Sequence, residues 1–127
     1  MAIGVTATAS AAFAQDVTLT ATVPFRFSID RNVNLAAGDY VVAHHGNLWS
    51  FRSKDSAQGA IVGSSVPLQD NANQGASLTF ECVRSYCQVR AIHVGNGTGI
   101  EVPAPKLSKS DIEELATLSV PLKPVHN

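Results

Sequence analysis

A two-residue alternation of apolar and non-apolar side chains runs through residues 1–29 of the chain. Every odd-numbered position in this range except Gln15 is apolar, while the even positions carry small, polar, charged or proline side chains. Because successive side chains of a β-strand point to opposite faces, the segment has one apolar face and one polar face. At about 3.3 Å per residue it would extend roughly 95 Å, several times the length of an ordinary strand. The segment must therefore break, bend or leave its own domain.

Gln15 and Asp16 interrupt the alternation and divide it into two pieces. Residues 17–29 carry the larger apolar side chains, and we expect them to belong to the core of the domain. Residues 1–14 follow the same rule with smaller side chains. The apolar face of this first piece consists of Ile3, Val5, Ala7, Ala9, Ala11 and Phe13. We therefore treat residues 1–14 as a separate N-terminal segment and residues 15–127 as a single domain.

Two interpretations of residues 1–14 remain open. Ala12-Phe13-Ala14 before Gln15 has the small-x-small pattern of a signal-peptidase site, which favours secretion and removal of the segment. However, no Lys or Arg precedes Arg26, and hydroxyl side chains interrupt the apolar stretch that a signal peptide needs. The segment is thus either the remnant of a signal peptide or a strand-forming N-terminal tail.

The composition limits the classes of partner. A chain of 127 residues fits one domain, and its net charge of −1 provides no basic surface for nucleic acid or for an anionic membrane. No uninterrupted apolar stretch is long enough to cross a membrane as a helix. Charged residues make up 15% of the chain, against roughly 25% in ordinary domains. This composition is typical of an extracellular β-protein, and we expect the chain to be secreted.

Turn-forming residues divide the rest of the chain into short strands. The expected strands are residues 40–43, 48–52, 60–66, 76–83 and 87–94, and polar or glycine-rich loops separate them. Short strands at such spacing predict an all-β fold. We expect an immunoglobulin-like sandwich or a flattened barrel of about seven or eight mostly antiparallel strands, with one short C-terminal helix.

The C-terminal region contains a helix-start signal followed by prolines. Ser110-Asp111-Ile112-Glu113 fits a capping box with Ser110 as the N-cap, which predicts a helix over residues 111–117. Residues 118–125 alternate again, but Pro121 and Pro124 restrict them to an edge strand or an extended arm.

Cys82 and Cys87 are predicted to form a disulfide bridge across a hairpin. Arg84-Ser85 can form a two-residue turn, so that Val83 pairs with Tyr86 and the two cysteines lie directly opposite each other. At non-hydrogen-bonded positions, opposite Cα atoms are about 4.5 Å apart, within the range for a disulfide. The alternative is a pair of reduced thiols in the core.

The histidines do not indicate a metal site. His44 and His45 are adjacent, so their side chains point to opposite faces of an extended segment. His93 lies in an expected strand and His126 in the C-terminal tail. The fold would have to bring at least two of these together, and we expect no bound metal.

The sequence contains no arrangement typical of an enzyme. Gly63-Ser64-Ser65 lacks the strand-to-helix elbow of a hydrolase serine, and the glycine-rich residues 95–99 lack the spacing and following helix of a nucleotide-binding loop. Most aspartates sit at expected turns, where Asp is favoured for local hydrogen bonding. We therefore expect a non-enzymatic protein without a cofactor.

Asn96-Gly97-Thr98 is a sequon for N-glycosylation within the glycine-rich loop. Asn96 is therefore a candidate glycan acceptor.

Two hydrophobic motifs resemble those of a family of small secreted proteins common in acidobacterial genomes. Val23-Pro24-Phe25-Arg26-Phe27 matches the family's Val-Pro-Phe-x-Phe pattern, and residues 35–42 match its Leu-x-Ala-Gly-x-Tyr-x-Val pattern. The resemblance covers roughly residues 17–115 and implies export and a compact β-fold of unassigned function. The chain departs from the family in having Cys82 and Cys87.

The first functional hypothesis is a self-assembling extracellular filament subunit. The apolar face of residues 1–14 would add to an open sheet edge of the next subunit, which is similar to donor-strand complementation in bacterial pili. A head-to-tail contact of this kind does not close on itself, so it builds a homo-polymer.

The second hypothesis is a monomeric envelope or binding module from which residues 1–14 have been removed. A sugar or peptide would bind around Trp49, Tyr40 and residues 95–99. The alternative role of Trp49 and Tyr40 is packing in the core.

Overall fold

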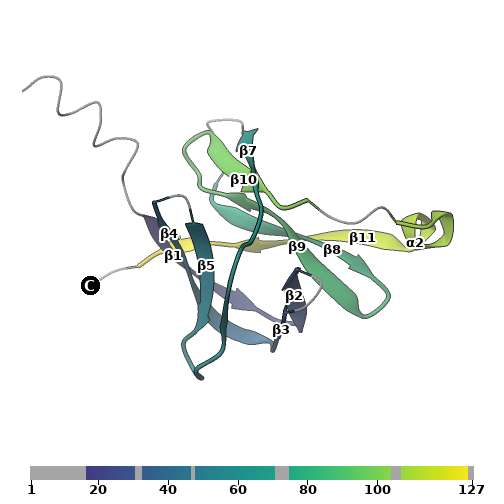
Figure 1. The fold of residues 1–127 in the computed structure, drawn as a ribbon, viewed down its shortest axis with the longest axis horizontal. Coiled ribbons are helices and arrows are strands. Elements are labelled where there is room, and N and C mark those ends of the chain that lie inside the picture. The colour runs from purple at the N-terminus through teal and green to yellow at the C-terminus, as the bar shows by residue number, and fades with distance from the viewer. Residues whose placement is uncertain (1–16, 31–32, 47, 71–74, 104–106, 126–127) are drawn as a thin grey trace, which may run out of the picture.

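A computed structural model of the protein describes residues 17–30, 33–46, 48–70, 75–103 and 107–125. In this part of the chain, two β-sheets pack against each other, and one short helix lies between the strands β10 and β11 (Figure 1). The predicted all-β class and the single short helix are confirmed. Both sheets have free edges in the described part rather than closing into a barrel, so the sandwich is the observed one of the two predicted architectures.

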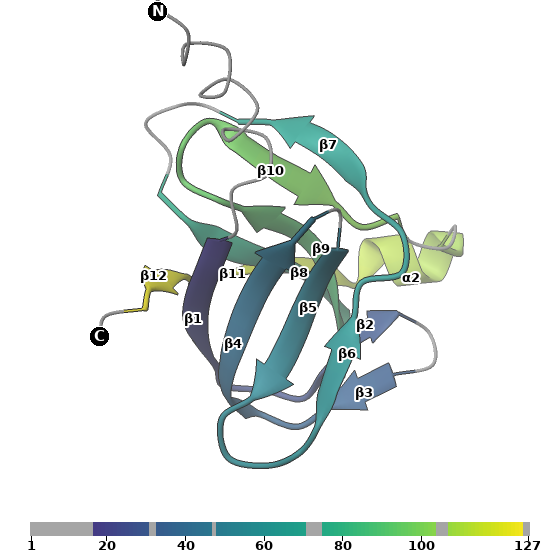
Figure 2. The same ribbon diagram turned by 60° about the vertical axis from the view of Figure 1, so that its left-hand side comes forward.

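Sheet A has five strands and forms one layer of the sandwich (Figure 2). Its strands, in spatial order, are β12 (Lys123–Pro124), β1 (Val17–Val23), β4 (Gly38–His45), β5 (Leu48–Ser53) and β6 (Gly59–Ile61). All neighbouring pairs in this sheet are antiparallel. The longest ladder joins β1 to β4, where Val17 lies opposite His44 and Val23 opposite Gly38.

Sheet B forms the second layer. Its main path is β11 (Leu115–Pro121), β8 (Ser77–Val83), β9 (Tyr86–His93), β10 (Thr98–Glu101) and β7 (Val66–Gln69). The short strands β2 (Phe27–Asp30) and β3 (Val33–Leu35) pair with each other, and β2 also pairs in parallel with β9. The register between β8 and β9 shifts after Thr79, which leaves Arg90 as an extra residue on β9. This bulge separates the part of β9 that pairs with β2 from the part that pairs with β10.

The alternation of residues 17–29 serves both sheets. β1 ends at Val23 in sheet A, and β2 begins at Phe27 in sheet B. The alternating residues Leu19, Ala21, Val23, Phe27 and Ile29 are all buried. Pro24 lies between the two strands, where its missing N–H removes no ladder hydrogen bond. The chain therefore bends from one sheet to the other near Pro24. Residues 17–29 form two strands of ordinary length instead of one long strand.

Aromatic side chains from both sheets meet at the centre of the core. Phe27 packs edge-on against Tyr40 and Phe80, with ring centroids 5.2 and 5.4 Å apart, and lies 6.0 Å from Phe51. These four side chains are at most 1% exposed. Phe25 packs edge-on against Phe80 from the side, at 4.9 Å. Each such contact adds to the free energy gained from burying the rings.

The helix differs from its predicted position. It is α2, Lys109–Glu113, and its N-cap is Ser108 rather than Ser110. The Ser108 hydroxyl accepts a hydrogen bond from the backbone N–H of Asp111 at 3.2 Å. Residues 115–117, which were expected to be helical, lie in β11 opposite residues 81–83 of β8. Pairing with β8 thus overrides the local helix signal.

The described residues contain more strands than the sequence pattern indicated. The expected strand 60–66 is divided into β6 and β7, which lie in different sheets, and β2, β3, β10 and β12 were not expected as separate strands. These six strands have two to four residues each. Such short strands hold too few residues for an alternation to be recognised. In the described part of the chain, no helix is long and apolar enough to cross a membrane.

Candidate functional site

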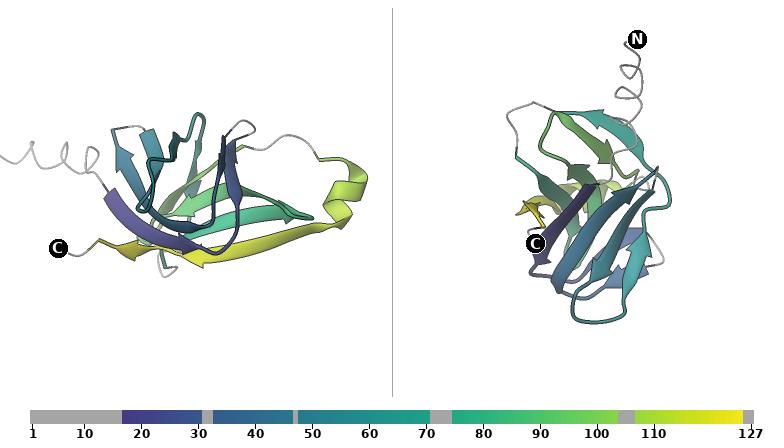
Figure 3. Two further views of the ribbon diagram at one scale, coloured as in Figure 1. Left: turned by 90° about the horizontal axis from the view of Figure 1, so that it is seen from below. Right: turned by 90° about the vertical axis from the view of Figure 1, so that its left-hand side faces the viewer.

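The strand β11 forms a long free edge of sheet B (Figure 3, left). It pairs with β8 over seven residues, from Leu115 opposite Val83 to Pro121 opposite Ser77. No other described strand pairs with its second side. The other edge strands, β3, β6, β7 and β12, have at most four residues. β11 is therefore the longest strand with a single neighbour in the described part of the chain.

The core-facing side of β11 is only partly covered. Val120 lies opposite the buried Leu78 and is itself 6% exposed. Two residues earlier, Leu118 lies opposite Phe80 and points to the same side, but it is 41% exposed. Ala116, opposite Cys82, is also exposed. Apolar side chains on the inner face of the sandwich thus reach the surface along this edge.

The path of the chain after β11 explains why only one end of the edge is covered. At Leu122 the chain crosses from sheet B to sheet A, and the Leu122 N–H donates to the Ala76 carbonyl at 3.0 Å. The next two residues form β12, which pairs with β1. Leu122 is buried, and this crossing covers the end of the sandwich at Val120. The other end, at Ala116 and Leu118, is left open.

The sequence of β11 lacks the usual protection of an edge strand. Natural edge strands avoid further pairing by being short or by carrying charged side chains, prolines or bulges. Residues 115–121 read Leu-Ala-Thr-Leu-Ser-Val-Pro, with no charged residue and with proline only at the last position. Its free backbone N–H and C=O groups can therefore pair with an additional strand.

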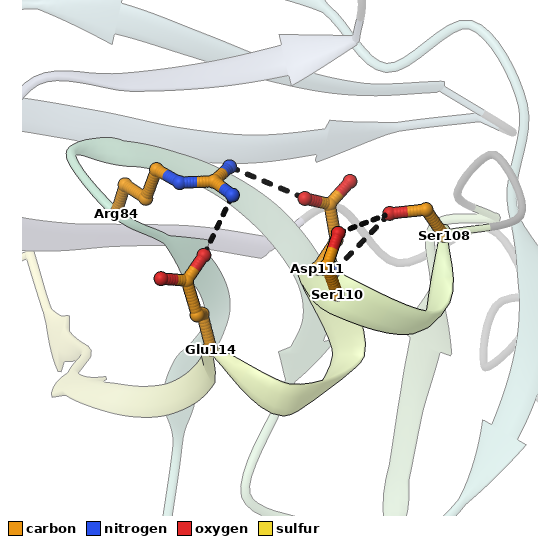
Figure 4. A network of polar contacts seen from close by, with 5 residues as sticks. All are labelled: Arg84, Ser108, Ser110, Asp111 and Glu114. Atoms are coloured by element: carbon orange, nitrogen blue, oxygen red, sulfur yellow. Dashed lines mark hydrogen bonds and ion pairs between the residues drawn. The ribbon is translucent and has the colours of Figure 1, made fainter.

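A cluster of ion pairs lies at the N-terminal end of β11 (Figure 4). Arg84, at the tip of the β8–β9 hairpin, contacts Asp111 at 3.2 Å and Glu114 at 2.7 Å. Asp111 lies in α2, and Glu114 is its C-cap. The Arg84 side chain is 60% exposed, so the pairs are screened by solvent and contribute little stability. They do join the hairpin to the short helix that leads into β11.

The predicted disulfide is present and joins β8, the neighbour of β11, to β9. Cys82 and Cys87 lie directly opposite each other, with Cα atoms 4.0 Å apart, and form a disulfide. Val83 pairs with Tyr86 as predicted, and Arg84 in the turn has a φ of 58°. The bridge lies beside the candidate edge, because Cys82 is also opposite Ala116 of β11.

The predicted donor residues Ile3, Val5, Ala7, Ala9, Ala11 and Phe13 lie outside the described residues. Two residues of the alternative binding module, Trp49 and Tyr40, do not lie at the surface. Trp49 and Tyr40 are 4% and 1% exposed and belong to the core. The Tyr40 hydroxyl donates to the Ala36 carbonyl at 2.6 Å, and Trp49 stacks on His44 at 4.7 Å.

Asn96 lies in an exposed turn between β9 and β10, as expected of a glycan acceptor. Its side-chain carbonyl accepts hydrogen bonds from the Thr98 N–H at 3.2 Å and from the Thr98 hydroxyl at 2.5 Å. The turn contains two glycines with positive φ, Gly95 and Gly97.

The structure brings together three polar residues that the sequence interpretation did not connect. Asp70 Oδ2 lies 2.7 Å from His93 Nδ1, and Thr79 Oγ1 lies 3.0 Å from His93 Nε2. The Asp70 and His93 side chains are only 8% and 12% exposed. Gly99 makes room for the pair, since a Cβ at this position would lie 3.1 Å from Asp70 Oδ2 and 2.5 Å from the Ile92 carbonyl oxygen.

These three residues have the order of groups found in a hydrolase triad, an acid, an imidazole and a hydroxyl. In the tautomer whose Nδ1–H donates to Asp70, Nε2 of His93 accepts a hydrogen bond from the Thr79 hydroxyl. However, Thr79 lies in β8 between β11 and β9, and none of the three residues lines the broad hollow along β5 and β6. Their evident role is to fix the end of β7 to β8 and β9. The sequence pattern places Asp70 at a turn and His93 in a strand, and it contains no signal that the two meet.

No group of histidine, cysteine, aspartate and glutamate that could hold a metal ion occurs among the described residues. A broad hollow of about 650 Å³ lies along β5 and β6 of sheet A. Its walls include His45, Leu48, Arg52 and Ile61, of which Leu48 and Ile61 are more than half exposed.

No protein-family model, no curated protein and no solved structure matches this chain. Within the described residues, the β11 edge combines free backbone groups with exposed apolar side chains from the inner face of the sandwich.

Proposed function

We propose that this protein is a non-enzymatic, secreted structural subunit that assembles head-to-tail into filaments. The N-terminal segment of one copy, residues 1–14, adds as a strand to the β11 edge of the next copy. Each copy then offers one donor segment and one acceptor edge, so the contact is heterologous and repeats without closing.

The observation that carries the proposal is the exposure of Leu118. This side chain points to the core side of sheet B, yet it is 41% exposed because sheet A does not extend over it. An added strand would cover Leu118 and Ala116 and would pair with the free backbone groups of β11. Burial of apolar area and ladder hydrogen bonds would both favour the contact.

The sequence of residues 1–14 suits this acceptor. A strand that adds to a half-buried edge needs one apolar face with a two-residue period, and Ile3, Val5, Ala7, Ala9, Ala11 and Phe13 provide one. Three alanines in the middle of this face require little space between the sheets. Backbone pairing supplies affinity, and the larger side chains of Ile3, Val5 and Phe13 determine in which register the segment pairs with β11.

Two observations support secretion. The Cys82–Cys87 disulfide is typical of proteins in oxidising compartments. The resemblance to small secreted acidobacterial proteins points the same way. The absence of a catalytic arrangement in the sequence supports a structural rather than an enzymatic role.

The acceptor edge is tested with Leu118→Lys in the full chain. A charge at this position would have to be buried unpaired beneath the added strand, so we expect filaments to disappear. Ile112→Lys is the matched control, because Ile112 is an exposed apolar residue of α2, 57% exposed, and lies off the edge. Negative-stain electron microscopy and light scattering measure assembly. Filaments of unchanged length in Leu118→Lys would exclude β11 as the acceptor.

The donor segment is tested with the double variant Ile3→Asp and Val5→Asp. Its control is Thr6→Asp and Thr8→Asp, which places the same charges on the polar face of the alternation. We expect only the first variant to abolish assembly. Equal loss in both variants, or in neither, would contradict strand addition with the predicted face.

Sequencing of the mature N-terminus separates this proposal from its alternative. If the protein isolated from its native source begins at Gln15, the donor is removed and the filament mechanism fails. The protein would then be a monomeric extracellular binding module. The hollow along β5 and β6 favours that second function, because it offers the exposed apolar side chains of Leu48 and Ile61 together with the cationic Arg52.

A further inference from the structure

The turn between β9 and β10 contains an Asn-Gly pair that several hydrogen bonds hold in a defined conformation. The Val94 N–H donates to the Thr98 carbonyl at 3.0 Å and closes the turn. Within it, the Asn96 side-chain carbonyl accepts two hydrogen bonds from Thr98, one from the backbone N–H and one from the hydroxyl. The turn thus holds the Asn96 amide in a defined orientation at the surface.

The two donors act on the atom where negative charge would develop during nucleophilic attack. Attack at the amide carbon converts Oδ1 into an oxyanion, and hydrogen-bond donors already aimed at that oxygen stabilise the transition state. The nearest nucleophile is the backbone nitrogen of Gly97. Gly97 has no Cβ to obstruct the approach, and no described residue accepts a hydrogen bond from its N–H.

We propose that Asn96 is a site of spontaneous covalent modification, in which Gly97 closes a succinimide that water then opens to aspartate or isoaspartate. The Gly97 nitrogen forms a bond to Asn96 Cγ, and the bond from Cγ to the side-chain nitrogen breaks. The Gly97 N–H proton leaves with that nitrogen as ammonia. Water then adds across one of the two C–N bonds of the ring. The only co-reactant is water, and no oxidant or reductant is needed.

The modification would affect the adjoining strands. The Gly97 carbonyl accepts a hydrogen bond from the Asp70 N–H at 3.0 Å, and this bond ties the end of β7 to the turn. An isoaspartate adds a backbone atom before Gly97 and displaces this carbonyl. The new carboxylate also places a negative charge in the turn that Asp70 contacts. Asp70 holds His93, so the change would reach the centre of sheet B.

The reaction and glycosylation are mutually exclusive at Asn96. The side-chain nitrogen that leaves as ammonia is the same atom that would carry a glycan. A protein produced without a glycosylation system therefore exposes the reactive form.

The test uses the folded, unglycosylated full chain, incubated at mildly alkaline pH in water enriched in oxygen-18. Peptide mapping by mass spectrometry follows the incorporation of the heavy oxygen, and an isoaspartate methyltransferase assay identifies the isomer. Asn34 provides an internal control, because it is exposed but is followed by Leu35. We expect the Asn96 peptide to convert while the Asn34 peptide stays unchanged. Equal conversion of both peptides, or of neither, would overturn the proposal.

The role of the turn is tested with Thr98→Val, which removes the hydroxyl donor. We expect conversion in the folded protein to slow roughly fivefold, the effect of losing one hydrogen bond in the transition state. In urea, where the turn is absent, Thr98→Val and the unchanged protein should convert at the same rate. Thr98→Ser keeps the hydroxyl and should restore the rate in the folded state. Conversion that is unchanged or faster in folded Thr98→Val, or equally slowed in urea, would show that the turn does not activate Asn96.

Discussion

Leu118 and Phe80 lie directly opposite each other on β11 and β8, yet Phe80 is fully buried and Leu118 is 41% exposed. At this end of β11, sheet B therefore extends beyond the cover that the rest of the sandwich provides. A monomer gains nothing from leaving a leucine on the inner face of its sandwich exposed. This relationship is the reason for assigning the acceptor role to β11.

Removal of the disulfide should lower stability moderately. Cys82 and Cys87 close a short loop, so the bridge restricts the unfolded chain little, and we expect the double variant Cys82→Ala and Cys87→Ala to lose about 2 kcal/mol at most. Urea unfolding measures the change. Adding a reductant to the unchanged protein should give a similar shift and should have no effect on the variant. A variant as stable as the oxidised protein would show that the bridge has no stabilising role.

Truncation of Phe27 should have one of the largest effects of any single substitution. Its ring contacts three other aromatic rings and is 1% exposed, so Phe27→Ala should cost about 3–5 kcal/mol. Phe25→Ala is the comparison, because Phe25 is only partly buried and packs against Phe80 alone among these rings. We expect a distinctly smaller loss there. Equal losses from urea unfolding would contradict a core centred on Phe27.

Stability should fall at alkaline pH through Tyr40. Burial, and to a lesser degree the charge of Asp55, raises the pKa of Tyr40 above its ordinary value of 10.0. Below that value both states keep the proton, and the contribution to stability is complete. Above it the unfolded chain ionises first, so the free energy of unfolding decreases as pH rises from about 10 towards the folded pKa. Urea unfolding at a series of pH values measures this decrease.

Tyr40→Phe is the control for this pH dependence. It keeps the ring contact with Phe27 but loses the hydrogen bond to the Ala36 carbonyl, so it should cost about 1 kcal/mol near neutral pH. Part of the alkaline loss should disappear in this variant. An identical alkaline profile in both proteins would assign the loss to other groups.

The contacts of His93 should stabilise the end of β7. His93→Ala leaves the Asp70 carboxylate without its imidazole partner in a site where it is 8% exposed, so we expect a loss of about 1–3 kcal/mol. Thr79→Val removes only the hydroxyl and should cost about 1 kcal/mol. Hydrogen exchange of the Asp70 and Leu68 amides should report local opening in His93→Ala. Unchanged protection of these amides would place the stabilising effect elsewhere.

Local patterns were sufficient to predict the features that depend on neighbouring residues in the chain. The turn at Arg84-Ser85 fixed the register of the β8–β9 hairpin and hence the Cys82–Cys87 bridge. The alternation of residues 17–29 identified the apolar side chains that are buried, but it placed Ser28 on the polar face, whereas Ser28 is also buried. It did not show that the chain changes sheets near Pro24, because both strands obey the same two-residue period.

Features that depend on distant contacts were missed for a physical reason. The sequence predicts Ser110 as the helix N-cap and a helix over residues 111–117. Because residues 115–117 pair with β8, the helix instead ends at Glu113. Asp70, Thr79 and His93 meet only because three strands pair in sheet B, and no local pattern contains that pairing. The open edge at Leu118 likewise follows from the relative width of the two sheets.

The register of β11 with β8 has a mechanical consequence for a filament under tension. A strand added to β11 would transmit force along the strand axis, parallel to its neighbours. The seven residue pairs between β11 and β8 would then be loaded in shear and would have to yield together rather than one after another. A subunit joined in this way would resist stretching far better than one whose strands are peeled apart from an end.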